Sequence, residues 1–147
     1  MVRVRTAAVL AALALALVLP AAANASATNA MIGKINAYRA AHGERPLRVA
    51  RTLMHSATSY SEYCMSTGFF GHLSRIRASS RFHTLGEILE IHTGDAAKIA
   101  LTFRDWINSP EHRAVILYPS FRWVGAGFTE GRFHGLRATI WVMHFGR

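Results

Sequence analysis

The sequence predicts an α+β fold, specifically an α-β-α sandwich in which a small antiparallel sheet lies between helices. One observation is a pair of segments in the first half of the chain whose apolar residues recur at helical spacing. The other is a pair of strand-like segments near the C-terminal end, the last of which is apolar on both faces. Such a strand is covered on both sides, so we expect helices above and below the sheet. The length of 147 residues suits one domain.

Residues 1–27 have the order of a secretory signal peptide. A basic start, MVRVR, precedes an apolar run over residues 7–19, and small residues up to Ala27 provide cleavage sites. The apolar run is too short for a comfortable membrane span. We therefore expect a signal peptide over 1–27, a domain over 28–147, and a protein secreted to the extracellular space or the cell envelope.

Two amphipathic helices are predicted next, one from Thr28 to Gly43 and one that ends at Gly68. Their apolar stripes are Met31, Ile35, Tyr38 and Ala41 in the first helix, and Leu53, Ala57, Tyr60 and Cys64 in the second. A tight connection around Pro46 should let them pack on a shared core. Cys64 is the only cysteine, so no intrachain disulfide can form, and its place in the stripe predicts a buried, inert thiol.

The middle of the chain predicts a long ordered loop, because the segment after Gly68 is rich in Gly, Ser and His and holds only a short apolar element at GEILEI. We expect Asp95 to cap a helix over AAKIALTFRDWIN. The stretch SPEHR then predicts a short helix, in which Ser109 is the cap, Pro110 takes the first helical position and His112 lies in the first turn. A histidine there either decorates the surface or points into a site.

Two strands are predicted over Phe121–Phe128 and Phe133–Phe145, and a turn at TEGR with Gly131 joins them as a hairpin. In the second strand, Leu136, Ala138, Ile140 and Val142 share one face, while Trp141, Met143 and Phe145 share the other. The second strand is therefore expected to be central in the sheet.

Five motifs occur in a fixed order along the chain: INAYRAAHG, GFFGH, GEIL, WINSPEHRAVILYPSFRWVGAGF and IWVMHFG. This order resembles the CAP superfamily, which comprises cysteine-rich secretory proteins, antigen 5 and plant pathogenesis-related class 1 proteins. The similarity is greatest to its bacterial secreted branch, which lacks disulfides, and it covers residues 31–146. Each motif alone is weak, but five in order behind a signal peptide are specific. The resemblance implies an α-β-α sandwich with a central cleft.

The resemblance also implies a His/Glu cluster in that cleft, which in some members binds a divalent metal. The matching positions are His72, Glu87 and His112, which are the expected cleft residues and the expected metal ligands. Two imidazoles and one carboxylate suit zinc or another divalent cation, with a fourth position open to water. The alternative is a polar cluster that only hydrogen-bonds within the cleft and holds loops together.

Three positions depart from the pattern of the bacterial branch. Ile88, Val115 and Met143 stand where relatives usually carry polar side chains, and a carboxylate with fewer amide donors around it is less well held. His144, beside Met143, could face the same cleft, although a satisfied or surface histidine is the simpler interpretation.

The formal net charge of +9 comes almost entirely from arginine, because the chain has only two lysines. Arginine favours bidentate contacts to phosphate and carboxylate. In an exported protein this favours an anionic cell-wall polymer or lipid ligand as the partner, and no nucleic acid; the alternative is a charge that serves solubility. No stable membrane span is expected after cleavage of the signal peptide, and the sequence leaves the oligomeric state open.

The sequence therefore predicts an exported binding module with a His/Glu cleft for a divalent metal or for a lipid or cell-wall ligand. One alternative is a metal-assisted hydrolase that acts on peptide, ester or cell-wall bonds. Another is a lipid or sterol carrier that uses apolar cleft walls. No nucleophile with an adjacent base is visible in the sequence, so no catalytic residue is assigned.

Overall fold

A computed structural model describes the backbone of residues 5–147 and the side chains of residues 23–147. The elements, in chain order, are α1 (Arg5–Ala41), β1 (Arg48–Val49), α2 (Arg51–Thr67), β2 (Leu85–Thr93), α3 (Ile99–Asn108), α4 (Pro110–Ile116), β3 (Trp123–Phe133) and β4 (Leu136–Gly146). The first four residues of the predicted signal peptide, and its side chains up to residue 22, lie outside this description, and its cleavage stays a prediction. Within the described part of the chain, no helix combines the length and the apolarity needed to cross a bilayer.

The sheet has the strand order β1-β3-β4-β2. Both β3 and β2 are antiparallel to β4, and the two-residue β1 is parallel to β3. The strand β4 is therefore central, as its two apolar faces predict. In this register His144 lies opposite Glu87 on one side and opposite Gly125 on the other.

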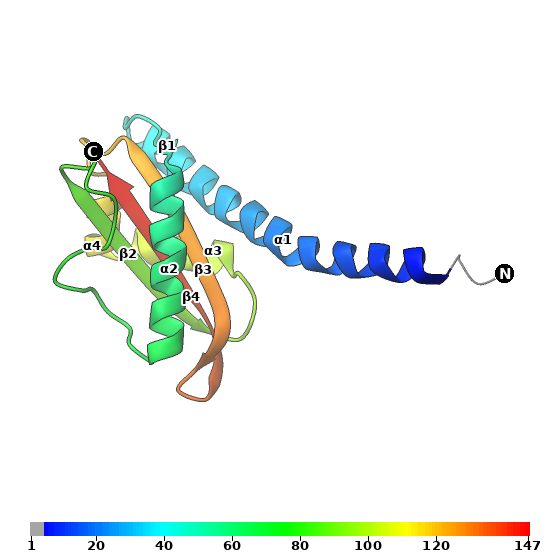
Figure 1. The fold of residues 1–147 in the computed structure, drawn as a ribbon. Helices are drawn as coiled ribbons and strands as arrows, with labels where there is room; N and C mark the ends of the chain where they lie inside the picture. The colour runs from blue at the N-terminus through cyan, green and yellow to red at the C-terminus, as the bar shows by residue number, and fades with distance from the viewer. Residues whose placement is uncertain (1–4) are drawn as a thin grey trace.

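Helices cover both faces of the sheet (Figure 1), which confirms the predicted α-β-α sandwich. On one face α2 packs against β3 and β4, where Ala57, Tyr60 and Cys64 meet Ile140 and Val142. On the other face, side chains from the second half of α1 and from α3 and α4 bury Trp141, Met143 and Phe145. These covering side chains are Met31, Ile32, Ile35, Trp106 and Ile116. The predicted stripe of α2 is buried along its whole length, including Cys64.

Two glycines of β3 let α2 approach the sheet closely. A Cβ atom on Gly125 would lie 2.0 Å from the carbonyl carbon of Leu53, and one on Gly127 would lie 2.3 Å from the backbone nitrogen of Thr58. No side chain fits in that space, because the helix backbone itself occupies it. The glycines therefore set the distance between α2 and the middle of the sheet.

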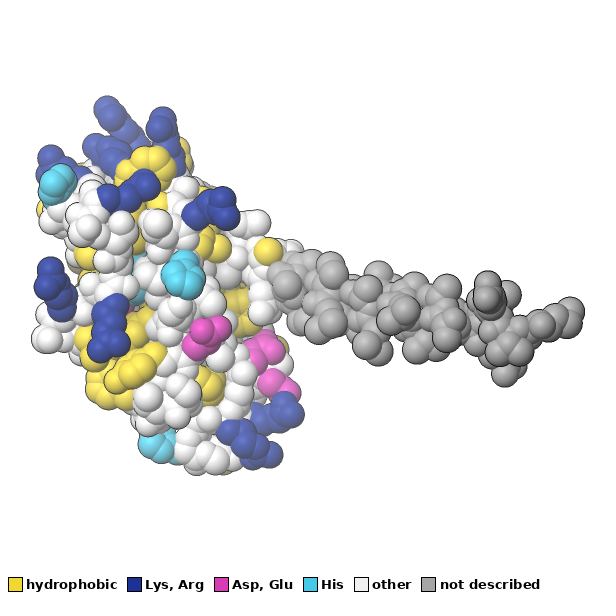
Figure 2. Space-filling model, viewed as in Figure 1, with side chains coloured by type: hydrophobic (Ala, Val, Ile, Leu, Met, Phe, Trp, Pro, Cys, Tyr) yellow, Lys and Arg dark blue, Asp and Glu magenta, His cyan; other side chains and the backbone are white. Residues whose placement is uncertain are grey.

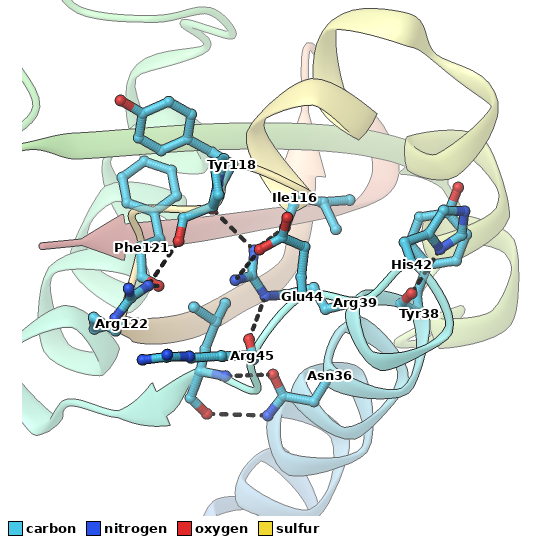
Figure 3. A network of polar contacts seen from close by, with 12 residues as sticks. Asn36, Tyr38, Arg39, His42, Glu44, Arg45, Ile116, Tyr118, Phe121 and Arg122 are labelled. Atoms are coloured by element: carbon cyan, nitrogen blue, oxygen red, sulfur yellow. Dashed lines mark hydrogen bonds and ion pairs between the residues drawn. The ribbon is translucent and has the colours of Figure 1, made fainter.

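On the opposite side, Arg39 joins the end of α1 to the end of α4 (Figure 3). Its guanidinium is fully buried and donates from Nε to the carbonyl of Arg45 at 2.9 Å. It also donates from Nη1 to the carbonyls of Ile116 at 2.6 Å and Tyr118 at 3.1 Å. The guanidinium of Arg39 thus supplies a hydrogen-bond donor to three carbonyls that lie at or beyond the ends of helices.

The hairpin turn was predicted wrongly at TEGR. Strand β3 continues through Gly131 to Phe133, and the turn is made by His134 and Gly135, which have φ angles of 48° and 83°. Positive φ at both central residues is what a tight two-residue hairpin requires. The end of the hairpin that contains TEGR runs beyond α2 into solvent (Figure 1), so its residues are polar although they belong to a strand. This polarity is why the stretch resembles a turn in the sequence.

Two further local predictions are corrected. Asp95 does not cap α3; the cap position is Lys98, with a φ of 46°, and the Asp95 carboxylate pairs instead with Arg137 on β4. The element at GEILEI is a full strand of nine residues, Leu85–Thr93, which hydrogen-bonds along β4. The irregular segment therefore ends at Thr84 and is shorter than predicted.

Candidate functional site

The irregular segment between α2 and β2 forms one wall of a cleft of about 890 Å³. His72 and Glu87 line the cleft together with the loop arginines Arg75 and Arg77, and Phe82 adds an apolar side chain to its lining. Tyr60 of α2 fixes the start of the loop, because its hydroxyl donates to the carbonyl of Gly71 at 2.7 Å. Burial raises the pKa of Tyr60, which keeps the hydroxyl protonated as a donor.

Glu87 is the centre of the polar network in this region. It lies on β2 with its side chain on the face covered by α2, and that side chain is only 4% exposed. Its Oε1 accepts from Nδ1 of His72, and its Oε2 accepts from Nε2 of His144, each at 2.8 Å. An ionised carboxylate only accepts, so both ring nitrogens that face it carry a proton. Two charge-assisted hydrogen bonds hold a buried carboxylate without an amide donor.

The network continues from His144 to α2. The ring of His144 is 1% exposed, and its Nδ1 lies 2.7 Å from Oγ of Ser56. A continuous chain of hydrogen bonds therefore runs from Ser56 through His144 and Glu87 to His72. Its outer end is open, because the side chain of His72 is 57% exposed.

His112 occupies the predicted helix position but does not join this network. Ser109 caps α4 and accepts from the backbone N–H of His112 at 3.5 Å. No hydrogen bond or ion pair links the described ring of His112 to His72 or Glu87, and its buried Nδ1 has no hydrogen-bond partner. The nearby charges that affect it include Glu90, whose side chain alternates to the face of β2 opposite Glu87.

The pKa of His112 is lowered, chiefly because burial disfavours the charged ring and also because His72 is close. The nearby carboxylates Glu90 and Glu111 act in the opposite direction. The lowered pKa favours the neutral ring of His112. The leading cause is burial rather than the positive end of the helix.

The residues that would hold a metal meet only in part. Among the side chains that the structure describes, no group of three or more His, Cys, Asp or Glu residues is arranged to hold a metal ion. His72 and Glu87 contact each other, whereas the described ring of His112 makes no hydrogen bond or ion pair with either, although His72 is close enough to lower its pKa. The present arrangement therefore does not fit a three-ligand site, and metal binding at His72, Glu87 and His112 stays a prediction.

Sequence reasoning missed Ser56 and placed His144 only as an optional neighbour of the cleft. The available signal was the alternation of β4, since His144 shares the face of Ile140 and Val142 and must meet α2. No pattern in the sequence shows that Ser56, on a different element, would lie beneath it.

Two further grooves are basic, and one of them shares Arg77, Ala78 and Ser79 with the cleft. One, of about 600 Å³, lies along α2 and is lined by Arg51, Thr52, His55, Ser56, Arg77, Ala78 and Ser79. The other, of about 520 Å³, is lined by Arg45, Pro46, Leu47, Arg48, Arg122 and Trp123. Figure 2 shows Lys and Arg side chains gathered at the end of the molecule where Figure 1 places β1 and the C-terminus.

Comparisons with known proteins agree with this architecture. Residues 32–145 match the family described as CAP: Cysteine-rich secretory protein family. A curated relative, the uncharacterised protein YkwD of Bacillus subtilis strain 168, is 29% identical over 119 residues. That alignment covers 75% of this chain but 43% of the relative, so the chain spans less than half of that protein's length.

Two solved structures illustrate the likeness in fold. An extracellular protein containing a SCP domain from Bacillus anthracis superposes with a TM-score of 0.66 at 19% identity, over 84% of this chain and 41% of that one. An outer surface protein from Borrelia burgdorferi superposes with a TM-score of 0.64 at 17% identity, over 81% of this chain and 90% of that one.

Proposed function

This chain belongs to the CAP family of cysteine-rich secretory proteins, and from that premise we propose that it is an exported module that binds an anionic ligand in the cleft beside His72 and Glu87. The ligand chemistry is a phosphate or carboxylate group, carried by a cell-wall polymer or by a lipid head group. The signal peptide predicted over residues 1–27 supports export. The descriptions of the two structural relatives, one extracellular and one on the outer surface, support the same location.

The observation that carries the proposal is the basic wall of the cleft. Arg75 and Arg77 line it, and neither has a carboxylate partner among the described side chains. Guanidinium groups that are not neutralised within the protein remain available for a phosphate or carboxylate. His72 is more than half exposed and can contact the same ligand while Glu87 holds its Nδ1.

Binding is tested with two probes, vesicles that contain phosphatidylglycerol and soluble polyglycerol phosphate. We expect the purified protein to bind at least one of them, and the double variant Arg75→Ala/Arg77→Ala to bind at least tenfold more weakly. The matched control Arg132→Ala removes a charge from the far end of the hairpin and should bind like the wild type. Affinity should fall as salt rises from 50 to 300 mM, because exposed charges are screened. Equal binding by the double variant and the wild type would contradict the proposal.

Export is tested by N-terminal sequencing of protein recovered outside the cells. We expect a start between Ala25 and Thr28. An intact Met1 on protein that stays in the cytosol would contradict export.

A metal-assisted hydrolase is the second proposal from the sequence, and the contact between His72 and Glu87 is the observation in its favour. The described ring of His112 makes no hydrogen bond or ion pair with these two side chains, which weakens this proposal. Metal analysis of purified wild type and His72→Ala separates the cases, since stoichiometric metal that is lost in the variant would support a divalent-metal site.

A further inference from the structure

We propose that Ser56, His144 and Glu87 form a second site, which transfers acyl groups from carboxylic esters. Ser56 is the nucleophile, His144 is its base, and Glu87 is a positioning residue that holds the ring of His144. The substrate class is an ester carried on an anionic molecule. The site shares Glu87 and Arg77 with the proposed anion cleft but opens into a different groove, and its test does not require binding in that cleft.

The connectivity is that of a serine nucleophile, a histidine base and an orienting carboxylate. Oγ of Ser56 lies 2.7 Å from Nδ1 of His144, and Nε2 of the same ring lies 2.8 Å from Oε2 of Glu87. Because the ionised carboxylate only accepts, Nε2 carries the proton and Nδ1 of the neutral ring has a free lone pair. That lone pair faces the hydroxyl of Ser56, which is the arrangement that proton removal requires.

One competing contact exists. Oγ of Ser56 also donates to the carbonyl of Leu53, one turn earlier on α2, at 3.2 Å, and because the hydroxyl has one proton it must turn from Leu53 to Nδ1 of His144 before proton transfer. The contact from Oγ of Ser56 to the Leu53 carbonyl, at 3.2 Å, is 0.5 Å longer than the contact to Nδ1 of His144, at 2.7 Å. The shorter contact is to the ring, so the base has the better geometry.

Access to Ser56 comes from the groove of about 600 Å³ along α2. Ser56 lies inside a helix, where backbone N–H groups are already bonded, so the backbone cannot stabilise an oxyanion there. The side chains that line the same groove can do so, and they include Arg51, His55 and Arg77. Neither arginine has a carboxylate partner among the described residues, which leaves both for the oxyanion and for an anionic substrate.

The reaction balances without a further reagent except water. Oγ of Ser56 bonds to the ester carbonyl carbon while its proton passes to Nδ1 of His144. The carbon–oxygen bond to the leaving alcohol breaks, and the alcohol takes that proton from His144. Water then attacks the acyl-serine, gives its proton to His144, and releases the carboxylic acid as the proton returns to Ser56.

The test uses a fluorophosphonate probe followed by peptide mass mapping, together with hydrolysis of p-nitrophenyl acetate by the full chain. We expect the probe to label Ser56 in the wild type. Ser56→Ala should lose the label and at least tenfold of the hydrolysis. The matched control Ser59→Ala removes an exposed hydroxyl from the same helix and should leave both signals unchanged.

Glu87 is tested as a positioning residue through the split between kcat and KM. Glu87→Gln should lower kcat at least tenfold with little change in KM, and Glu87→Asp should recover part of the loss. His144→Gln should abolish labelling.

Because Glu87 and His144 are buried, a thermal melt is recorded for each variant. If the Glu87 and His144 variants do not fold, Ser56→Ala alone tests whether Ser56 is the nucleophile. Labelling that is absent from wild-type Ser56, or hydrolysis that Ser56→Ala leaves intact, would overturn the proposal.

Discussion

Arg39 carries a charge at a position with no exposed side-chain surface. Burial lowers its pKa, but guanidinium groups stay protonated in proteins, so the charge must be compensated locally. Three carbonyls and the carboxylate of Glu44, 3.8 Å from Nη2, provide that compensation (Figure 3). A single side chain thereby fixes how the end of α1 meets the end of α4.

Replacing this side chain should be costly. Arg39→Met keeps much of the apolar stem but removes the guanidinium donor from three carbonyls, of which that of Tyr118 keeps only a 3.4 Å contact to the N–H of Phe121, so we expect the free energy of unfolding to fall by about 3–5 kcal/mol. Urea denaturation measures the loss. The control Arg104→Met removes an exposed arginine paired with Asp105 and should change stability by less than about 1 kcal/mol. A loss of similar size in both variants would show that the network is not what stabilises this corner.

His112 should make stability depend on pH. Its pKa is lowered in the folded protein, so below about pH 6.5, the ordinary value, the unfolded chain binds more protons. The free energy of unfolding should therefore fall as pH drops from 7.5 to 5, and His112→Gln should reduce that slope. The control His83→Gln changes an exposed ring and should keep the wild-type slope. Identical slopes in wild type and His112→Gln would contradict the assignment.

At the residue scale, the sequence predicted the pairing of His72 with Glu87 only through family resemblance. The roles of Ser56 and His144 were beyond its reach, because the two residues are 88 positions apart and their contact depends on how α2 sits on the sheet. The alternation of residues along a strand or helix predicts which face of that element a side chain occupies. It does not predict which side chain of another element packs against that face.

At the scale of elements, long periodic segments were predicted correctly, whereas turns, helix caps and very short strands were not. The stripe of α2 and the two faces of β4 repeat often enough to determine the structure. The turn at His134 and Gly135, by contrast, contains a histidine with positive φ, which few sequence rules anticipate. The cap of α3 was misassigned because Asp95 finds a more distant partner in Arg137. Strand β1 was missed because two residues show no period.

Gly125 should tolerate no side chain. Gly125→Ala places a methyl group 2.0 Å from the backbone of Leu53, so α2 must move away, and we expect a loss of about 3 kcal/mol or more. Since Gly125 lies opposite His144, the same shift should separate Ser56 from the ring. The control Gly33→Ala lies on α1, where an added Cβ meets nothing within 4 Å, and it should be neutral or stabilising by up to about 1 kcal/mol. Chemical denaturation of both variants tests this, and equal stability would show that α2 does not depend on the glycine.

Across the whole molecule, the unpaired positive charges and the interactions that stabilise the fold lie in different regions. The grooves at one end collect arginines without acidic partners among the described side chains, whereas the centre is held by packing and buried hydrogen bonds and not by a disulfide, because the chain has a single cysteine. The stability of the fold is therefore expected not to depend on redox conditions, and the basic end is the part of the surface on which the proposed anionic ligand would bind.

Cys64 should be inert until the protein unfolds. Its side chain has no exposed surface, and burial raises the pKa of the thiol, so the reactive thiolate is disfavoured. We expect no reaction with a thiol-specific disulfide reagent in buffer, and complete reaction in 8 M urea. Thermal melts with and without a reductant should overlay. Rapid reaction of the native protein would show that α2 opens locally.

The central place of β4 also determines when the domain can form. This strand is the last of the four to be synthesised, yet it supplies the hydrogen bonds for both β2 and β3 and buried side chains for both layers. Until β4 is made, β2 has no hydrogen-bonded neighbour in the sheet, so the finished fold cannot form. If the chain is exported through a translocation channel, as proposed above, this strand order would delay the finished fold until synthesis of the last strand.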